Sequence, residues 1–327
     1  SDVYKRQIDP YVEYSSRKGN KHSLKTRLYS VENTFEDEDK DNASKLWYGE
    51  YRYLKRLRSQ TRWTSGLSYT RSSVIANLYD DHAGSNMAVY TQMDGRLYQR
   101  LQYSLGIRWE VNSQDGDFYY SLPVLRMGLN YQAGESTFLR LSLGQGYRFP
   151  SVAEKYTDTN IGGLRIFPNP ELDPEKGWSA EVGIKQGFSW GNWMAYADLA
   201  LFWTEYNNMI EYTFGAYPPD SVDIPSIEDV GFKALNIENA RINGVELTFN
   251  GMGSLGQLGM VLTGGYTFMN PVDPAYIEEF GKGEDEAYIL NYRRRHLFKA
   301  DLELEFWKMF AGMNLQYNSR MINVDEV

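Results

Sequence analysis

Residues 139–188 decide the fold of this chain, and they read LRLSLGQGYRFPSVAEKYTDTNIGGLRIFPNPELDPEKGWSAEVGIKQGF. In residues 139–148, Leu139, Leu141 and Leu143 occupy every second position, and small or polar residues such as Arg140 and Ser142 stand between them. Residues 177–188 alternate again, whereas residues 149–176 do not alternate and are rich in Pro, Gly and Asn. A period of two is the pattern of a β-strand with two different faces. The stretch therefore predicts two amphipathic strands joined by a long irregular connection.

The length of these strands suits a membrane. About ten residues rising roughly 3.3 Å each, with a tilt of about 40°, span about 25 Å. This is the height of the apolar band of an outer-membrane barrel. The clearest strand of the chain, at residues 101–111, has the same length and the same alternation.

Short turns and long loops alternate along the whole chain. Turns are expected near residues 18–20, 58–60 and 98–100, and long loops at 32–44, 72–85, 207–231 and 270–287. Strands that run up and down give this pattern, whereas a Greek-key sandwich mixes loop lengths at both ends and a propeller shows a blade-length repeat. We predict an all-β fold, a transmembrane antiparallel up-and-down β-barrel, with about 14 strands in this chain.

The polarity of the two strand faces predicts their orientation. The face opposite the leucines holds Arg, Glu, Asp, Lys and Gln beside Gly. Such a face makes a poor dry core but a suitable polar lumen. We therefore expect Leu139, Leu141 and Leu143 to face lipid and Arg140 and Ser142 to face the lumen.

The composition excludes several other classes of protein. The net charge of −9 provides no basic stripe for phosphates, so we expect no nucleic-acid partner. No apolar run approaches the roughly 20 residues that a spanning helix needs. Cysteine is absent, which excludes disulfides and thiolate metal sites, and the 26 tyrosines and 8 tryptophans suit the aromatic girdles of a barrel.

Both ends of the chain resemble cut ends. Residues 1–7 (SDVYKRQ) resemble translated adapter read-through, and we expect them to be non-native. No secretory signal precedes residue 8, and no closing aromatic strand ends the chain. We interpret residues 8–327 as part of a larger barrel.

Two motifs in the irregular connection resemble a known family. Tyr147-Arg148-Phe149-Pro150 and the later stretch PNPELDPE at residues 168–175 are similar to the barrel of TonB-dependent outer-membrane receptors. Residues 236–247 (NIENARINGVEL), 292–302 (YRRRHLFKADL) and 88–110 resemble further strands of that family.

The resemblance implies a function and a location. The intact protein would be a 22-stranded barrel of the bacterial outer membrane, plugged by an N-terminal domain that contacts the TonB complex. It would import a scarce nutrient, such as a siderophore-iron complex, a corrinoid, haem or a glycan, and its partners would be the lipid bilayer and this small-molecule or metal-chelate ligand. The alternative is a complete smaller barrel, acting as a passive channel or as an outer-membrane enzyme.

Five residues are candidates for ligand binding in such a receptor. Arg148 ends an inward-facing row at the loop-side rim, where it would contact ligand or plug; we favour an ion pair with a neighbouring carboxylate. Aromatic and Arg side chains in long loops suit ligand capture. They are Tyr156, Arg165, Tyr212 and Tyr217. For each of the four, packing within the loop is the alternative.

Histidine placement argues against haem. Haem receptors of this family usually carry a His between the two motifs, and residues 150–168 contain none. His82 falls in a predicted long loop, where we expect a solvated side chain rather than a ligand.

No other motif indicates a cofactor or catalysis. Asp37, Asp39 and Asp41 are spaced like the start of a calcium loop, but Asn42 stands where Gly is needed and Tyr48 where Glu is needed. The pair Gly144-x-Gly146 lacks the third Gly and the helix of a dinucleotide site. We expect no enzyme activity, no bound metal and no cofactor.

Overall fold

The computed structural model describes residues 2–35, 41–58, 60–76, 78, 80–161, 163–218, 226–282 and 287–323. Most of them form one 18-stranded sheet, and β17 pairs with β20 separately. The strands are β1 (Asp2–Ile8), β2 (Tyr11–Ser15), β3 (Lys21–Thr34), β4 (Asn42–Arg58), β5 (Thr61–Ala76), β6 (His82–Leu97), β7 (Leu101–Gln114), β8 (Asp117–Tyr120), β9 (Val124–Gln132), β10 (Thr137–Arg148), β11 (Thr159–Ile161), β12 (Leu164–Phe167), β13 (Glu175–Trp190), β14 (Trp193–Ala216), β15 (Val230–Leu255), β16 (Leu258–Val272), β17 (Arg293–Arg294), β18 (His296–Phe306), β19 (Met309–Asn318) and β20 (Met321–Ile322).

The sheet is an antiparallel meander. From β3 to β7, then through β9, β10, β13, β14, β15, β16, β18 and β19, each strand pairs with the next. Two passes of the chain across the sheet are each split into two short strands: β1 and β2 both pair with β3, and β8 and β9 both pair with β7. When the β11–β12 hairpin is left out and each split pass is counted once, the 18 strands make 14 passes across the sheet. The predicted up-and-down arrangement of about 14 strands is confirmed.

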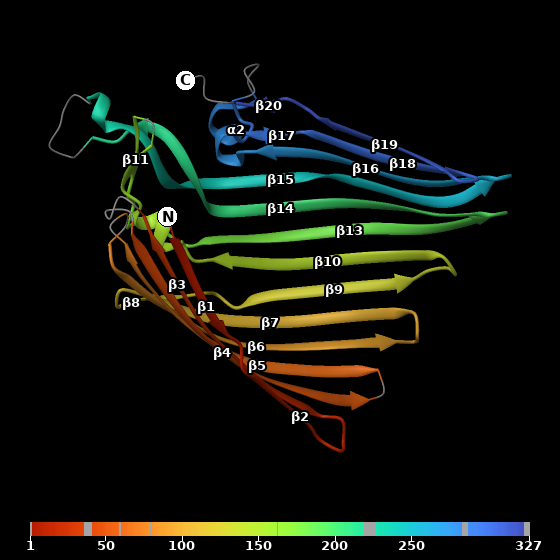
Figure 1. The fold of residues 1–327 in the computed structure, drawn as a ribbon, viewed down its shortest axis with the longest axis horizontal. Helices are drawn as coiled ribbons and strands as arrows, with labels where there is room; N and C mark the ends of the chain where they lie inside the picture. Colours follow the sequence, from red (N-terminus) through yellow and green to blue (C-terminus); the bar gives the residue numbers. More distant parts are fainter. Residues whose placement is uncertain are drawn as a thin grey trace.

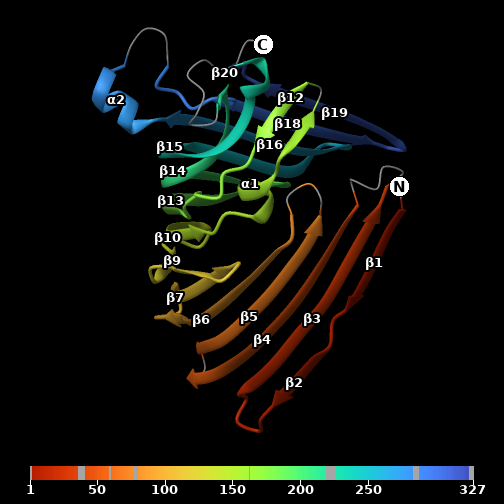
Figure 2. The same cartoon turned by 90° about the vertical axis from the view of Figure 1, so that its left-hand side faces the viewer.

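The sheet is curved and open (Figures 1 and 2). Within the described residues, β19 pairs only with β18, and β1 and β2 pair only with β3. The short turns gather at one end, and the longer connections gather at the other with α1 (Val152–Tyr156) and α2 (Pro274–Phe280) (Figure 1). No described helix is both long enough and apolar enough to cross a membrane.

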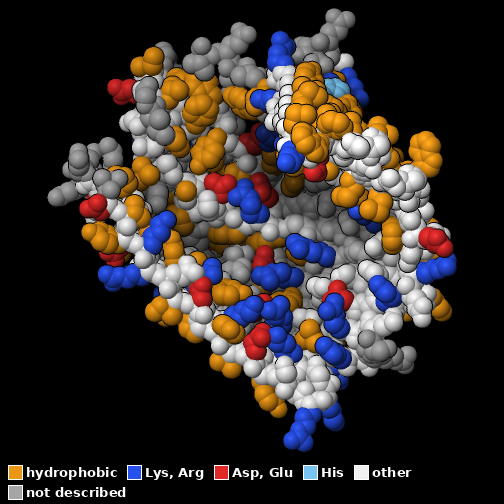
Figure 3. All heavy atoms as spheres, turned by 45° about the vertical axis from the view of Figure 1, so that its right-hand side comes forward, with side chains coloured by type: hydrophobic (Ala, Val, Ile, Leu, Met, Phe, Trp, Pro, Cys, Tyr) orange, Lys and Arg blue, Asp and Glu red, His pale blue; other side chains and the backbone are white. Residues whose placement is uncertain are grey.

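The two faces of the sheet differ as predicted. The register places Leu139 opposite Ile184 and Leu141 opposite Val182, so the apolar rows of adjacent strands join. On the other face, the Nε of Arg140 donates to Glu181 at 3.0 Å, and the same guanidinium also pairs with Asp198 of β14. Charged side chains gather in the hollow of the molecule (Figure 3). The hollow face is therefore the polar one, and the leucines point outward.

Two of the predicted long loops are shorter than the alternation suggested. β14 continues to Ala216 and β15 begins at Val230, so both ends of the expected loop 207–231 are strand. In the same way β5 reaches Ala76 and β6 begins at His82, within the expected loop 72–85. The reason is that a β-ladder is held by main-chain hydrogen bonds, which do not require apolar alternation.

Residues 2–8 form an edge strand. β1 pairs along the loop-side half of β3, from Asp2 opposite Thr34 to Ile8 opposite Leu28. The hypothesis that residues 1–7 are non-native concerns the origin of this segment and stays a prediction.

Candidate functional site

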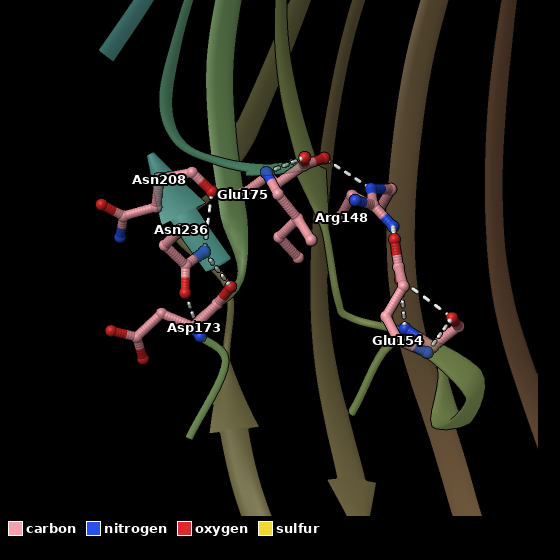
Figure 4. Close-up of polar contacts among 8 residues, drawn as sticks. Arg148, Glu154, Asp173, Glu175, Asn208 and Asn236 are labelled. Atoms are coloured by element: carbon pink, nitrogen blue, oxygen red, sulfur yellow. Dashed lines mark hydrogen bonds and ion pairs between the residues drawn. The ribbon is translucent and has the colours of Figure 1, made fainter. Parts of the chain in front are cut away.

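Arg148 is the last residue of β10, and its side chain binds residues of the connection that follows. Its Nη1 donates to both carboxylate oxygens of Glu154, at 2.9 and 2.8 Å, and its Nε donates to Glu175 at the start of β13. The other oxygen of Glu175 accepts from the backbone N–H of Ile210 in β14 at 2.7 Å (Figure 4). One guanidinium therefore links β10, α1, β13 and, through Glu175, β14.

The helix α1 begins at a capping box. Ser151 Oγ accepts from the Glu154 backbone N–H at 3.2 Å, and Glu154 accepts from the Ser151 backbone N–H at 2.8 Å (Figure 4). This exchange satisfies donors that a helix start leaves free. Burial works to raise the pKa of the Glu154 carboxyl, but the bonds from Ser151 and Arg148 outweigh it and hold that pKa below its usual value. Glu154 is thus a charged anchor between the helix and β10.

The side-chain amides of Asn169 and Asn236 hold the stretch 169–175 against β14 and β15. Asn169 Nδ2 donates to the Ala234 carbonyl at 2.8 Å. Asn236 Nδ2 donates to the Asp173 carbonyl at 3.0 Å and to the Asn208 carbonyl at 2.9 Å, and its Oδ1 accepts from the Asp173 N–H (Figure 4).

Leu172 lies in the same stretch, between Asn169 and Asp173. It is only 2% exposed and forms a small apolar cluster with Ile210 and Ala234. The asparagines and Leu172 together make residues 149–176 a packed insert on the inner side of the curved sheet, where α1 lies in Figure 2.

A buried lysine sits among aromatic rings at the end of α1. Lys155 is 2% exposed, and its Nζ lies 5.4 Å from the ring centroid of Tyr119, 5.7 Å from Phe149 and 5.9 Å from Tyr156. Burial lowers the pKa of Lys155, and nearby aspartates such as Asp115 work against that shift. The rings stabilise the cation through their negative faces.

Tyr156 packs on His82, the first residue of β6. Their ring centroids are 3.7 Å apart with an interplanar angle of 17°, and His82 Nδ1 lies 2.8 Å from a carboxylate oxygen of Asp115. Burial raises the pKa of the Tyr156 hydroxyl, and Asp115 adds to this. The side chain of His82 is 13% exposed, so the expectation of a solvated loop histidine is wrong. Because the β5–β6 connection is shorter than predicted, His82 belongs to β6, where the Tyr156 ring of α1 packs on it.

Arg165 and Tyr217 both contact Phe167. Arg165, in β12, forms a two-pronged pair with Asp158 at 2.9 and 2.7 Å, and its guanidinium lies 5.0 Å from the ring of Phe167. Phe167 also contacts Tyr217, whose hydroxyl donates to the Thr213 carbonyl at 2.8 Å. β12 joins β15 by a parallel pairing, which fixes this group against the sheet.

Nearly the whole chain matches one known protein family. The family model for the TonB-dependent receptor-like β-barrel matches residues 2–326. The chain belongs to this family. A sequence search of curated proteins finds no match for this receptor barrel.

Solved structures share the fold of this receptor barrel. The siderophore receptor PirA from Pseudomonas aeruginosa aligns with a TM-score of 0.71 at 12% identity, covering 97% of this chain and 56% of that one. A double mutant of the Serratia marcescens hemophore receptor HasR, in complex with its hemophore HasA and heme, gives 0.59 at 15% identity, covering 97% and 64%. The FrpB iron transporter from Neisseria meningitidis (F3-3 variant) gives 0.62 at 12% identity, covering 95% and 50%. This chain therefore spans between half and two thirds of those chains.

The five predicted ligand residues do not form a single cluster in the receptor barrel. Arg148 is ion-paired, as favoured, although a ligand or plug contact stays a prediction. Tyr156 packs beside His82, and Arg165 and Tyr217 share Phe167. Tyr212 lies on the same face of β14 as Ile210 and is 43% exposed. A ligand role for each of these residues remains a hypothesis.

Sequence reasoning missed Lys155, and it predicted no calcium site in the acidic loop. No period or motif marks Lys155, because its three rings come from separate positions of the chain. Asp37 and Asp39 lie outside the described residues, while Asp41 accepts a hydrogen bond from the Phe35 backbone at 2.7 Å. Among the residues that the structure describes, no three His, Asp or Glu side chains gather as metal ligands.

Proposed function

We propose that this chain forms most of the membrane barrel of an outer-membrane TonB-dependent receptor that actively imports a scarce nutrient. The observation that carries this proposal is the family match over residues 2–326, joined with an apolar outer face and a charged hollow face. Since the solved relatives are longer, we infer that the rest of the protein supplies a plug domain and the segment that contacts TonB. The lipid bilayer of the outer membrane would surround the leucine rows.

A metal chelate is the ligand class that we propose. In support, the similar structures include a siderophore receptor, a hemophore receptor in complex with its hemophore and heme, and an iron transporter. Tyr212 suits contact with such a ligand, because it is exposed on the hollow face near the long-loop end. A tyrosine offers a large rigid ring together with one hydroxyl. Corrinoids and glycans are the other ligands that the test below separates from an iron chelate.

Energy dependence tests the transport proposal. Cells that carry the full-length receptor, and a deletion strain, are grown under iron limitation and given a radioactive iron–siderophore chelate. We expect uptake that needs the receptor and stops when the proton gradient is collapsed. Receptor-dependent entry that continues without the gradient would indicate a passive channel and would overturn the proposal. The same assay with labelled corrinoid or oligosaccharide identifies those ligands.

A pair of tyrosine variants tests the ligand face. Tyr212→Ala removes a ring from the hollow face, and Tyr120→Ala removes an exposed ring from β8, opposite Val111 on the outer face. We expect Tyr212→Ala to weaken chelate binding by roughly 5- to 30-fold, the effect of losing an interface anchor, and Tyr120→Ala to leave it within twofold. Equal Kd values for the two variants would remove Tyr212 from the site.

A further inference from the structure

A groove with basic residues at its rim lies on the outer face of the sheet. It has a volume of about 360 Å³ and crosses β1, β3, β4 and β5 toward the long-loop end. Two rows of cross-strand partners border it. The upper row is Arg6, Ser30, Lys45 and Ser73, and the lower row is Ile8, Leu28, Trp47 and Arg71. Basic and apolar side chains therefore meet within one groove.

Lys45 and Arg71 are the basic pair on which the inference depends. Lys45 is opposite Ser73 and Arg71 is opposite Trp47, so the two are diagonal neighbours across β4 and β5. Diagonal positions are about 7–8 Å apart, which long side chains span. Within the part of the chain that the structure describes, neither side chain forms an ion pair, and the nearest carboxylate in the register is Glu32, opposite Ala43 on the loop side. Arg6 adds a third charge to the groove, but we expect residues 1–7 to be non-native, so Lys45 and Arg71 supply the two charges that would bind a ligand.

Apolar surface begins directly below the basic pair. The Trp47 ring lies toward Gly49, where a Cβ would stand 3.5 Å from its Cη2, and it packs 5.4 Å from the Tyr69 ring. Gly49 is nearer the short-turn end, so the indole points away from the loops and toward the middle of the apolar band. Trp side chains favour this level of a membrane, between head groups and acyl chains.

We propose that this groove binds a phosphate-bearing lipid, with the phosphate between Lys45 and Arg71 and an acyl chain along Trp47. A guanidinium and an ammonium form charge-assisted hydrogen bonds to phosphate oxygens, and Arg suits their geometry. The two positive charges attract an anionic head group at the membrane surface. Desolvated apolar area beneath them favours a lipid over free phosphate. The inference rests on the proposed outer-membrane location.

The test uses the full-length receptor, purified from the membrane in a neutral detergent. It is titrated with dioleoyl phosphatidic acid or dioleoyl phosphatidylcholine, and native mass spectrometry counts the bound lipid. The loss variant is Lys45→Gln with Arg71→Gln, and the conservative variant is Lys45→Arg with Arg71→Lys. Lys55→Gln is the matched control, because Lys55 is an exposed outward-facing residue at the other end of β4, opposite Trp63.

We expect phosphatidic acid to bind at least tenfold more tightly than phosphatidylcholine. The double Gln variant should lose that preference, while the conservative variant and Lys55→Gln retain it, and equimolar inorganic phosphate should not displace the lipid. Equal binding of the two lipids, an equal loss in Lys55→Gln, or displacement by inorganic phosphate would each overturn the lipid site. A receptor that is absent from the outer-membrane fraction of cells would instead overturn the proposed location, and the lipid site with it.

Discussion

Leu172→Ala should release the insert 149–176 from the barrel wall without unfolding the barrel. Leu172 is 2% exposed and packs on Ile210 and Ala234, so truncation to Ala removes about three buried methyl or methylene groups and leaves a cavity. The lost transfer free energy is about 0.8 kcal/mol per group, and with the cavity the cost reaches about 2–4 kcal/mol. The cost falls on local opening of the insert, because the ladders of β10 and β13 do not depend on Leu172.

Amide hydrogen exchange measures that local opening. For the full-length receptor in detergent, peptides from residues 149–176 should exchange roughly 30- to 1,000-fold faster in Leu172→Ala than in the wild type. Peptides from β10 and β13 should change little. Leu122→Ala is the control, because Leu122 is an exposed leucine of the β8–β9 connection. If Leu172→Ala accelerated exchange no more than Leu122→Ala, the insert would not depend on this leucine and the reasoning would be refuted.

Three further perturbations test other parts of the structure. Leu141→Arg should destabilise the membrane-inserted state by about 2–4 kcal/mol, whereas Ser142→Arg on the hollow face should cost little; equal costs in a refolding titration would contradict the assignment of faces. The pKa of Glu154 is lowered from 4.5 in the folded protein, so its contribution is present above about pH 4.5 and is lost as pH falls through the lowered pKa. The protection of amides in the insert, relative to intrinsic exchange at the same pH, should therefore fall in acid for the wild type, and Glu154→Gln should remove that fall. Gly231→Ala places a Cβ 1.9 Å from a backbone carbonyl of β12 and should detach the β11–β12 hairpin, seen as new protease cleavage there, while Gly265→Ala, with open space at its Cβ, should not.

Strand existence and strand faces could be predicted from the sequence. The alternation of Leu139, Leu141 and Leu143 is a local property, since period two places those side chains on one face whatever strands lie beside them. The order of turns and loops then favoured neighbouring antiparallel pairing, which the register confirms. Strand ends were predicted poorly, because β14 extends to Ala216 through main-chain pairing with β15, and that pairing leaves no periodic mark.

The candidate site could be predicted in position but not in its contacts. Residues 149–176 stood out by composition, and they lie at the end of the long connections as expected. The contacts of His82 depend on α1 reaching across to β6, and sequence distance hides that approach. The burial of Lys155 could not be predicted either, because the Tyr119 ring beside it comes from β8 and not from the insert.

By itself the sequence determined an antiparallel membrane-type meander with a polar and an apolar face, and its motifs pointed to the receptor family. Those features depend on local periodicity and on short contiguous motifs. Only the tertiary structure decided that Asn169, Leu172 and Asn236 fasten an insert to the wall, and that Lys45 and Arg71 face one groove. Register and curvature bring those side chains together, and both depend on how each strand pairs with its neighbours, which the periodicity within one strand does not specify.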